Sequence, residues 1–172
     1  MNVHKLVTIG LLTAFAIVIA IAESFIPSIG IPGVKLGLAN IVILVTLYEL
    51  GVVEAILINV LRVLIVSFVR GTFLSMGFFM SLTGAFLSLG IMILFYLLIK
   101  KFSIIGVSVI GSVFHVTGQI LVAMIYLESA YIFYYLPVIA LSAIITGVIV
   151  GITAHSIIQS KIIAKQKAKY HF

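Results

Sequence analysis

Long apolar stretches run through this chain, and a few polar or helix-breaking positions divide them into six segments. A helix needs roughly 20 apolar residues to cross the hydrocarbon core of a bilayer. Clear divisions fall at Pro27, at the stretch Arg70-Gly-Thr72, at Lys100-Lys101 and at Glu128. The pattern predicts membrane spans over residues 6–26, 36–50, 51–69, 73–99, 104–127 and 131–159.

The region between residues 36 and 69 is the least certain part of this pattern. Its first run, 36–50, is short for a full span, and Gly51 separates it from the next. Two short, partly re-entrant helices and one long helix bent at Gly51 both fit. Because every connection is short, we expect an all-α integral membrane protein, a six-helix bundle forming a single membrane domain over residues 1–172.

Composition supports a membrane protein and excludes several kinds of chemistry. Hydrophobic residues make up 64% of the chain and charged residues 8%, against about 25% charged in an average soluble domain. The chain contains no Cys and no Asp, so a thiolate nucleophile and an Asp-rich Mg²⁺-diphosphate site are excluded. It has no P-loop motif, and its four His lie in separate segments. We therefore expect neither nucleotide hydrolysis nor a metal site, and no enzymatic activity.

Basic residues in the short loops predict the orientation. With the N-terminus inside, the inner segments hold Lys5, Lys100, Lys101 and four Lys between residues 161 and 169, and the outer ones hold Lys35 and Arg70. Seven against two favours cytoplasmic N- and C-termini. The Lys-rich tail is typical of a stop-transfer cluster at the membrane surface, and we expect no nucleic-acid partner.

One face of the 104–127 segment carries polar side chains at helical spacing: Ser108, Ser112, His115, Gln119 and Tyr126. In a bilayer such side chains turn towards a neighbouring helix or a wet cavity. For His115 and Gln119, contact with a ligand and hydrogen bonding between helices are equally good interpretations.

Arg62 is the most costly residue of the chain to bury in a membrane. It lies in the middle of the 51–69 segment, where insertion costs at least about 2.5–3.5 kcal/mol. Asn59 lies three residues earlier on the same face. Arg62 could contact an anionic or polar head group, or form an internal ion pair.

Small residues at four-residue spacing mark faces where helices approach closely. Ala16 and Ala20 form such a face on the 6–26 segment, and similar stripes occur on the 73–99 and 131–159 segments. We expect Ala16 and Ala20 to dock a partner protein or to pack tightly against a neighbouring helix.

Two stretches resemble the Gx transporter family of small bacterial membrane proteins, which is often labelled heptaprenyl diphosphate synthase component I. They are Ile31-Pro-Gly-Val-Lys-Leu-Gly-Leu-Ala-Asn40, and Arg62 through Arg70-Gly-Thr-Phe-Leu-Ser75 with Ser81-Leu-Thr-Gly84. The family is similar to the substrate-binding S components of energy-coupling factor (ECF) vitamin transporters, whose first helix docks the coupling subunit through an A-x-x-x-A face. Some relatives belong to loci for flavin-based extracellular electron transfer.

The resemblance implies three functions in a bacterial plasma membrane. The first is capture of a small molecule (a vitamin-like, flavin, quinone or isoprenoid compound) for uptake with an ECF coupling subunit and its ATPases. The second is a membrane subunit that holds a flavin or quinone cofactor and works with electron-transfer proteins. The third is a non-catalytic partner of a polyprenyl diphosphate synthase.

We expect a ligand site towards the outer half of the bundle, which fits the first two functions. Gly30, Pro32 and Gly33 would form a lid loop, since glycine permits unusual backbone angles and proline stiffens the chain. The cations suggest an anionic or electron-rich ligand. The expected ligand-binding residues are Lys35, Asn40, Asn59, Arg62, His115 and Gln119.

Overall fold

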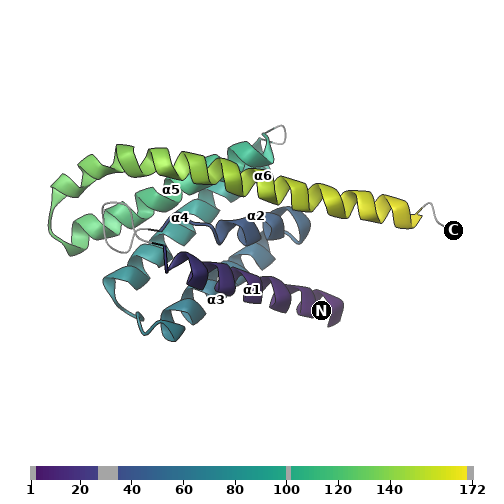
Figure 1. Cartoon of the computed structure of the whole chain (residues 1–172), viewed down its shortest axis with the longest axis horizontal. Coiled ribbons are helices and arrows are strands. Elements are labelled where there is room, and N and C mark those ends of the chain that lie inside the picture. Colours follow the sequence, from purple (N-terminus) through teal and green to yellow (C-terminus); the bar gives the residue numbers. More distant parts are fainter. Residues whose placement is uncertain (1–2, 27–34, 100–101, 170–172) are drawn as a thin grey trace.

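A computed structural model of the chain describes residues 3–26, 35–99 and 102–169, with side chains as far as residue 160. All regular structure in these residues is helical (Figure 1). The elements are α1 (Val3–Glu23), α2 (Asn40–Glu49), α3 (Val52–Val69), α4 (Met76–Leu98), α5 (Ile104–Tyr126), the 3₁₀ helix η1 (Ala130–Tyr135) and α6 (Leu136–Lys169).

Five of these helices, α1, α3, α4, α5 and the η1–α6 segment, are long and apolar enough to cross a membrane. The prediction of a multi-pass helical membrane protein is therefore confirmed, but six full spans are not. The segment predicted at 36–50 begins as a helix only at Asn40 and is 10 residues long. Such a helix rises about 15 Å, half the thickness of the hydrocarbon core.

Helices α2 and α3 are separate, so the alternative of one long bent helix is wrong. Gly51 between them has φ +114°, a backbone angle that side chains of L-residues rarely allow. The amide groups of Leu50 and Gly51 both donate to the carbonyl of Thr46, which closes the end of α2. The chain then turns and α3 begins at Val52.

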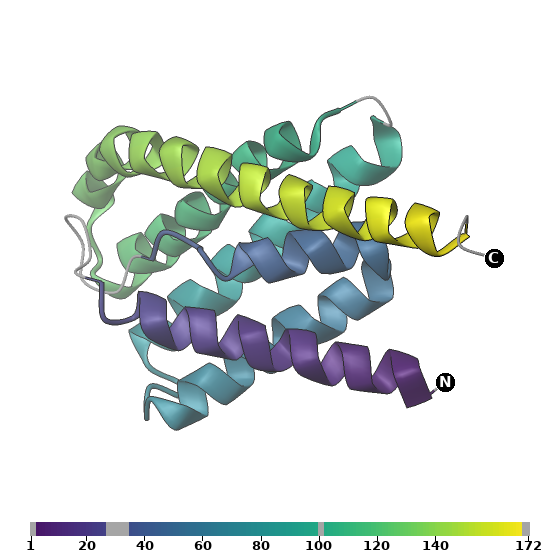
Figure 2. The same ribbon diagram turned by 45° about the vertical axis from the view of Figure 1, so that its right-hand side comes forward.

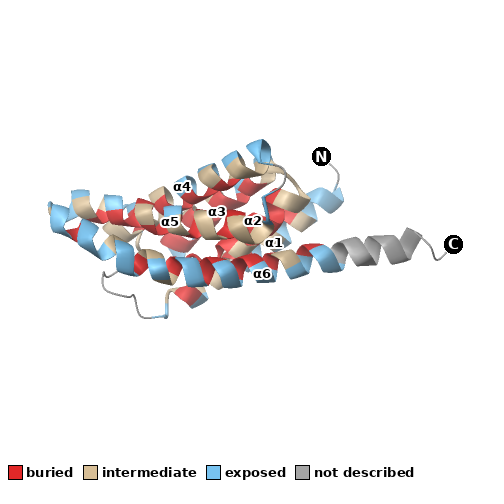
Figure 3. Cartoon of the chain, turned by 90° about the horizontal axis from the view of Figure 1, so that it is seen from above, coloured by how far each residue is buried: buried red, intermediate tan, exposed pale blue. Residues whose placement is uncertain are grey.

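The short helix α2 lies among the longer ones and contacts α1, α3 and α6 (Figure 2). Seven of its ten residues are buried, as expected for a helix that is apolar all round. On the long helices, exposed positions alternate with buried ones along each ribbon (Figure 3). In a membrane, lipid would cover these exposed apolar side chains.

Helices α4, α5 and α6 pack most closely, through the small residues that the sequence singled out. A Cβ added at Gly118 on α5 would lie 2.9 Å from the Gly84 backbone on α4. A Cβ at Gly147 on α6 would lie 2.8 Å from the Val109 backbone on α5. The stripes on α4 and α6 are therefore internal packing faces.

The start of α1 and the end of α6 lie at the same end of the molecule (Figures 1 and 2). Helix α6 is 34 residues long, about 51 Å at the usual helical rise, and its last turns extend past the bundle. The cytoplasmic placement of this end stays a prediction.

Candidate ligand-binding pocket

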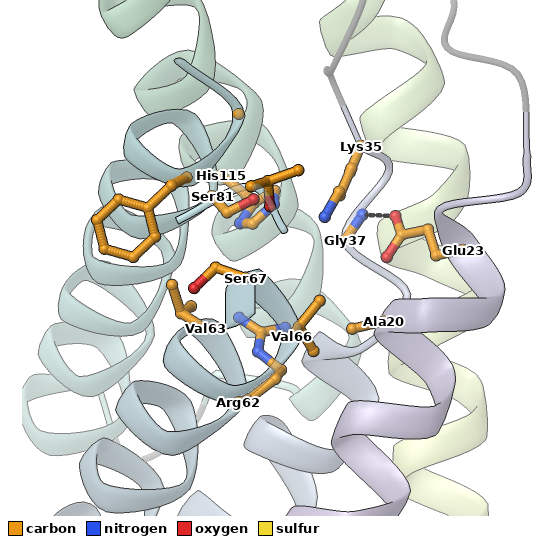
Figure 4. Close-up of a pocket in the computed structure, with 13 residues that line it drawn as sticks. Ala20, Glu23, Lys35, Gly37, Arg62, Val63, Val66, Ser67, Ser81 and His115 are labelled. Carbon is orange, nitrogen blue, oxygen red and sulfur yellow. Dashed lines mark hydrogen bonds between the residues drawn. The ribbon is translucent and has the colours of Figure 1, made fainter. Parts of the chain in front are cut away.

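A pocket of about 460 Å³, including the space at its mouth, opens between α1, α3, α4 and the segment before α2. It lies towards the end of the bundle opposite to the described termini, where α1 and α3 end and α4 begins. Its lining residues are Ala20, Glu23, Lys35, Gly37, Arg62, Val63, Val66, Ser67, Thr72, Gly77, Phe78, Ser81 and His115 (Figure 4).

Arg62 enters this pocket from the middle of α3 and is 5% exposed. Its Nη2 donates to Asn59 Oδ1 at 2.8 Å, and Asn59 Nδ2 donates to the Ala85 carbonyl at 3.1 Å. Arg62 Nε has no hydrogen-bond partner among the described residues. Among the residues that the structure describes, no carboxylate forms an ion pair with Arg62. Asn59 thus holds one edge of the guanidinium and leaves the Nε donor unused.

The segment Lys35–Ala39, which we call the strap, forms one wall of the pocket in front of α2. Two side chains from different helices bind its backbone. The Gly37 amide donates to Glu23 Oε1 of α1 at 2.5 Å, and the Lys35 amide donates to Gln119 Oε1 of α5 at 2.9 Å. The strap has no regular secondary structure at its start and is not helical, so these bonds satisfy amides that a helix would otherwise pair.

Helix α5 contributes His115, whose side chain and that of Ser81 face Lys35 across the pocket (Figure 4). His115 is 4% exposed, and its Nε2 lies 2.8 Å from Gln119 Nε2. The Gly84 backbone carbonyl lies near the ring and is an acceptor for a ring N–H, although its geometry does not meet that of a hydrogen bond. His115 Nδ1 nevertheless makes no hydrogen bond to the described residues.

The pocket carries an excess of positive charge. Lys35 and Arg62 line it with one acid, Glu23, and one oxygen of Glu23 already accepts a backbone hydrogen bond. Burial lowers the pKa of Lys35, the cations of Arg70 and Arg62 lower it further, and Glu23 opposes them. An anion in the pocket would relieve the repulsion among these cations.

The structure places the six predicted ligand-binding residues in two groups. Lys35, Arg62 and His115 line the pocket. Asn59 and Gln119 lie behind them and hydrogen bond to lining residues. Asn40 lies at the start of α2, where its Nδ2 donates to Ser88 Oγ at 3.3 Å.

Three other sequence predictions have different outcomes. The lid residues Gly30, Pro32 and Gly33 lie outside the described residues. Ala16 and Ala20 are buried within the chain, at 0% and 7% exposure, and Ala20 packs with Ala39 and Val66. They occupy the internal face that tight packing requires and are not open to a partner. Tyr126 is 57% exposed and does not continue the buried polar face of α5.

Sequence reasoning did not assign Glu23, Phe78 or the hydroxyl groups of Ser67, Thr72 and Ser81 to the site. A signal for Glu23 was present, because it continues the face of Ala16 and Ala20 by a further three residues. The hydroxyl groups gave no comparable signal, since Ser and Thr are common in membrane helices that merely pack together.

The described residues thus form a multi-pass helical membrane protein with a cationic, partly apolar pocket between its helices. The profile of the heptaprenyl diphosphate synthase component I family matches residues 12–157, and the chain belongs to this family. No curated protein and no solved structure gives a significant match. The similarity to S components of ECF transporters stays a prediction.

Proposed function

We propose that this protein is a non-enzymatic binding protein of the bacterial plasma membrane, which captures a small molecule through an anionic or oxygen-rich head group. The observation that carries the proposal is the buried Arg62, whose Nε lacks a partner while its guanidinium lines the pocket. Glu23, the acid in the lining, attracts Arg62 but forms no ion pair with it, and a buried cation that lacks a paired counter-ion is costly. A ligand oxyanion would supply both the missing charge and the missing acceptor.

The other lining residues suit a ligand with two different ends. Its anionic head group would lie against the cations, and the rest of the molecule would lie against the apolar wall of the pocket. Lys35 adds a second cation, and Val63, Val66 and Phe78 supply apolar surface. The short helix α2 begins just behind the strap, so the positive end of its dipole adds to the same field. Interrupted helices that surround an anionic ligand within the membrane are typical of transporters.

An S-component-like role in ECF-type uptake agrees with a pocket at the end of the bundle away from the termini. In this role the predicted lid loop would cover the ligand, and a coupling subunit with ATPases would drive release. The buried Ala16 and Ala20 do not offer the docking face, so a coupling subunit would bind another surface of the helices.

A second candidate follows from the family name. A non-catalytic partner of a polyprenyl diphosphate synthase would bind a prenyl diphosphate, which pairs an anionic head with an apolar tail. The cations and the apolar wall of the pocket suit both halves of such a compound. A membrane subunit holding a flavin or quinone is the third candidate, in which Arg62 would bind a phosphate or a carbonyl oxygen.

Mass spectrometry of small molecules that co-purify in mild detergent tests the proposal. We expect an anionic or oxygen-rich compound with the native protein and much less of it with Arg62→Gln. Lys5→Gln is the matched control, because it removes one positive charge from an exposed position at the start of α1, at the other end of that helix from the pocket. Equal amounts of the compound with native protein and Arg62→Gln would contradict the proposal. A vitamin, a prenyl diphosphate, a flavin and a quinone have distinct masses, so the compound also separates the candidates.

A further inference from the structure

The hydrogen bonds around Gln119 determine which nitrogen of His115 carries its hydrogen. A backbone amide can only donate, so the Lys35 amide fixes Oε1 as the oxygen of the Gln119 side chain. The other end of this amide, Nε2, is a donor only, and it lies 2.8 Å from His115 Nε2. His115 Nε2 therefore accepts this hydrogen bond.

A ring nitrogen that accepts a hydrogen bond carries no hydrogen. The imidazole is therefore neutral, because an imidazolium would direct a second donor at Gln119 Nε2. Its single hydrogen lies on Nδ1. This is the nitrogen that makes no hydrogen bond to the described residues, on a side chain that is 4% exposed and lines the pocket.

We infer that Gln119 is a positioning residue that holds His115 as a neutral Nδ1–H donor for an oxygen of the ligand. The inference rests on the proposed function and deepens it. His115 and Arg62, each with a buried nitrogen that lacks a hydrogen-bond partner, line the same pocket as Lys35, so the pocket would select a group that only accepts hydrogen bonds. Phosphate, diphosphate and carboxylate groups have this property.

The same bonds connect the strap to the ligand. Gln119 bonds to Lys35 with one end of its amide and to His115 with the other. A strap that moved away from α5 would release Gln119, and the imidazole would then be free to move its hydrogen to Nε2. The donor at Nδ1 is thus available only while the strap is in place.

Nitrogen NMR of detergent-solubilised protein with ¹⁵N-labelled histidine tests this directly, without any ligand. We expect the His115 signals to show a hydrogen-bearing Nδ1 and a hydrogen-free Nε2. His115→Asn assigns these signals by their loss, since three other His are present. In Gln119→Leu, which cannot donate, we expect a mixture of the two tautomers. A native His115 with its hydrogen on Nε2, or on both nitrogens, would overturn the inference.

Binding of inorganic diphosphate gives a second, independent readout. The Asn amide nitrogen can take the place of Nδ1, whereas that of Gln reaches nearer to Nε2. We expect His115→Asn to bind within a few-fold of the native protein and His115→Gln to bind about tenfold more weakly. Equal affinities of these two variants would overturn the role of Nδ1.

The Arg62 and His115 variants together distinguish a failure of this inference from a failure of the proposed function. If Arg62→Gln abolishes diphosphate binding while both His115 variants bind normally, the pocket binds anions and the inference about His115 is wrong. If Arg62→Gln leaves binding unchanged, the proposed function is wrong whatever tautomer is observed. Titration with vesicles containing an anionic phospholipid, in place of diphosphate, distinguishes a lipid head group from a free anion as the source of the oxygens.

Discussion

Gly37 is the residue where backbone conformation and ligand site depend most directly on each other. Its φ is +83°, and an added Cβ would lie 3.1 Å from Asn40 Nδ2 and 3.2 Å from His115 Cδ2. Gly71 has a similar φ of +63° with nothing near an added Cβ. Substitutions at these two glycines can therefore distinguish the effect of backbone strain from the effect of displacing His115.

We expect Gly37→Ala and Gly71→Ala each to lose about 1–2 kcal/mol of stability through the unfavourable backbone angle. Only Gly37→Ala should also weaken diphosphate binding, because its methyl group displaces His115. Thermal unfolding in detergent and a binding titration measure the two effects. Equal diphosphate affinities for the two variants would show that the strap does not position His115.

Lys35 makes anion binding depend on pH. Burial lowers the pKa of Lys35 in the free protein, with the nearby cations of Arg70 and Arg62 adding to the effect. A bound anion stabilises the ammonium and raises that pKa, so above the free pKa binding must take up a proton. Affinity for the anion should therefore fall as pH rises.

Sulfate is a suitable probe of this pH dependence, because its charge stays constant over the range. We expect sulfate affinity to decrease as pH rises towards 10.5, the ordinary pKa of lysine, and to depend much less on pH in Lys35→Arg. A native affinity that stays flat up to pH 10.5 would mean that Lys35 does not contact the anion.

Residue types and spacing indicated some of the contacts around the candidate pocket, whose role as a ligand site stays a prediction. Asn59 and Arg62 share a face and hydrogen bond at 2.8 Å, as their spacing of three suggested. Lys35 and His115 line the same pocket, although they lie far apart in the sequence. Hydropathy could not show that Gln119 joins them from behind, because its bond to Lys35 depends on where the strap lies.

At the scale of elements, the pattern of apolar residues predicted the start and the length of α2 wrongly. Residues 36–50 are mostly apolar, with Asn40, Thr46 and Glu49 as polar exceptions, and the hydropathy of this run does not show that the helix begins at Asn40. The strap stays non-helical because Gly37 takes a positive φ and its amide binds Glu23. These are contacts with another helix, which local sequence does not reveal.

Helix α1 offers a test of tight packing with a matched control on the same helix. Ala16 is 0% exposed within the bundle, whereas Ala14 is exposed. Ala16→Leu adds bulk to a filled face and should cost about 1–3 kcal/mol. Ala14→Leu adds the same bulk towards lipid and should change little. Thermal unfolding of both variants in detergent measures the difference, and equal midpoints would contradict the close contact of α1.

At the scale of the whole molecule, the pocket lies away from the two termini, so orientation decides which compartment supplies the ligand. The Lys and Arg distribution predicts cytoplasmic termini and therefore a pocket near the outer surface. Ser129 lies between α5 and η1, towards the pocket end, and Ser103 precedes α5 at the other end.

The absence of native Cys permits a direct test of orientation in intact cells. Ser129→Cys should react with a membrane-impermeant maleimide added outside, and Ser103→Cys should react only after the cells are permeabilised. Labelling of Ser103→Cys in intact cells would reverse the orientation and place the pocket near the cytoplasm.

Calorimetric titration with inorganic diphosphate tests most directly whether the pocket binds an anionic head group through Arg62. The measurement compares native protein, Arg62→Gln and the charge-matched control Lys5→Gln in the same detergent. We predict that Arg62→Gln binds about 10- to 100-fold more weakly, the loss expected for a charge-assisted hydrogen bond, and that Lys5→Gln stays within a few-fold of native. No binding to the native protein, or equal weakening in both variants, would contradict the account.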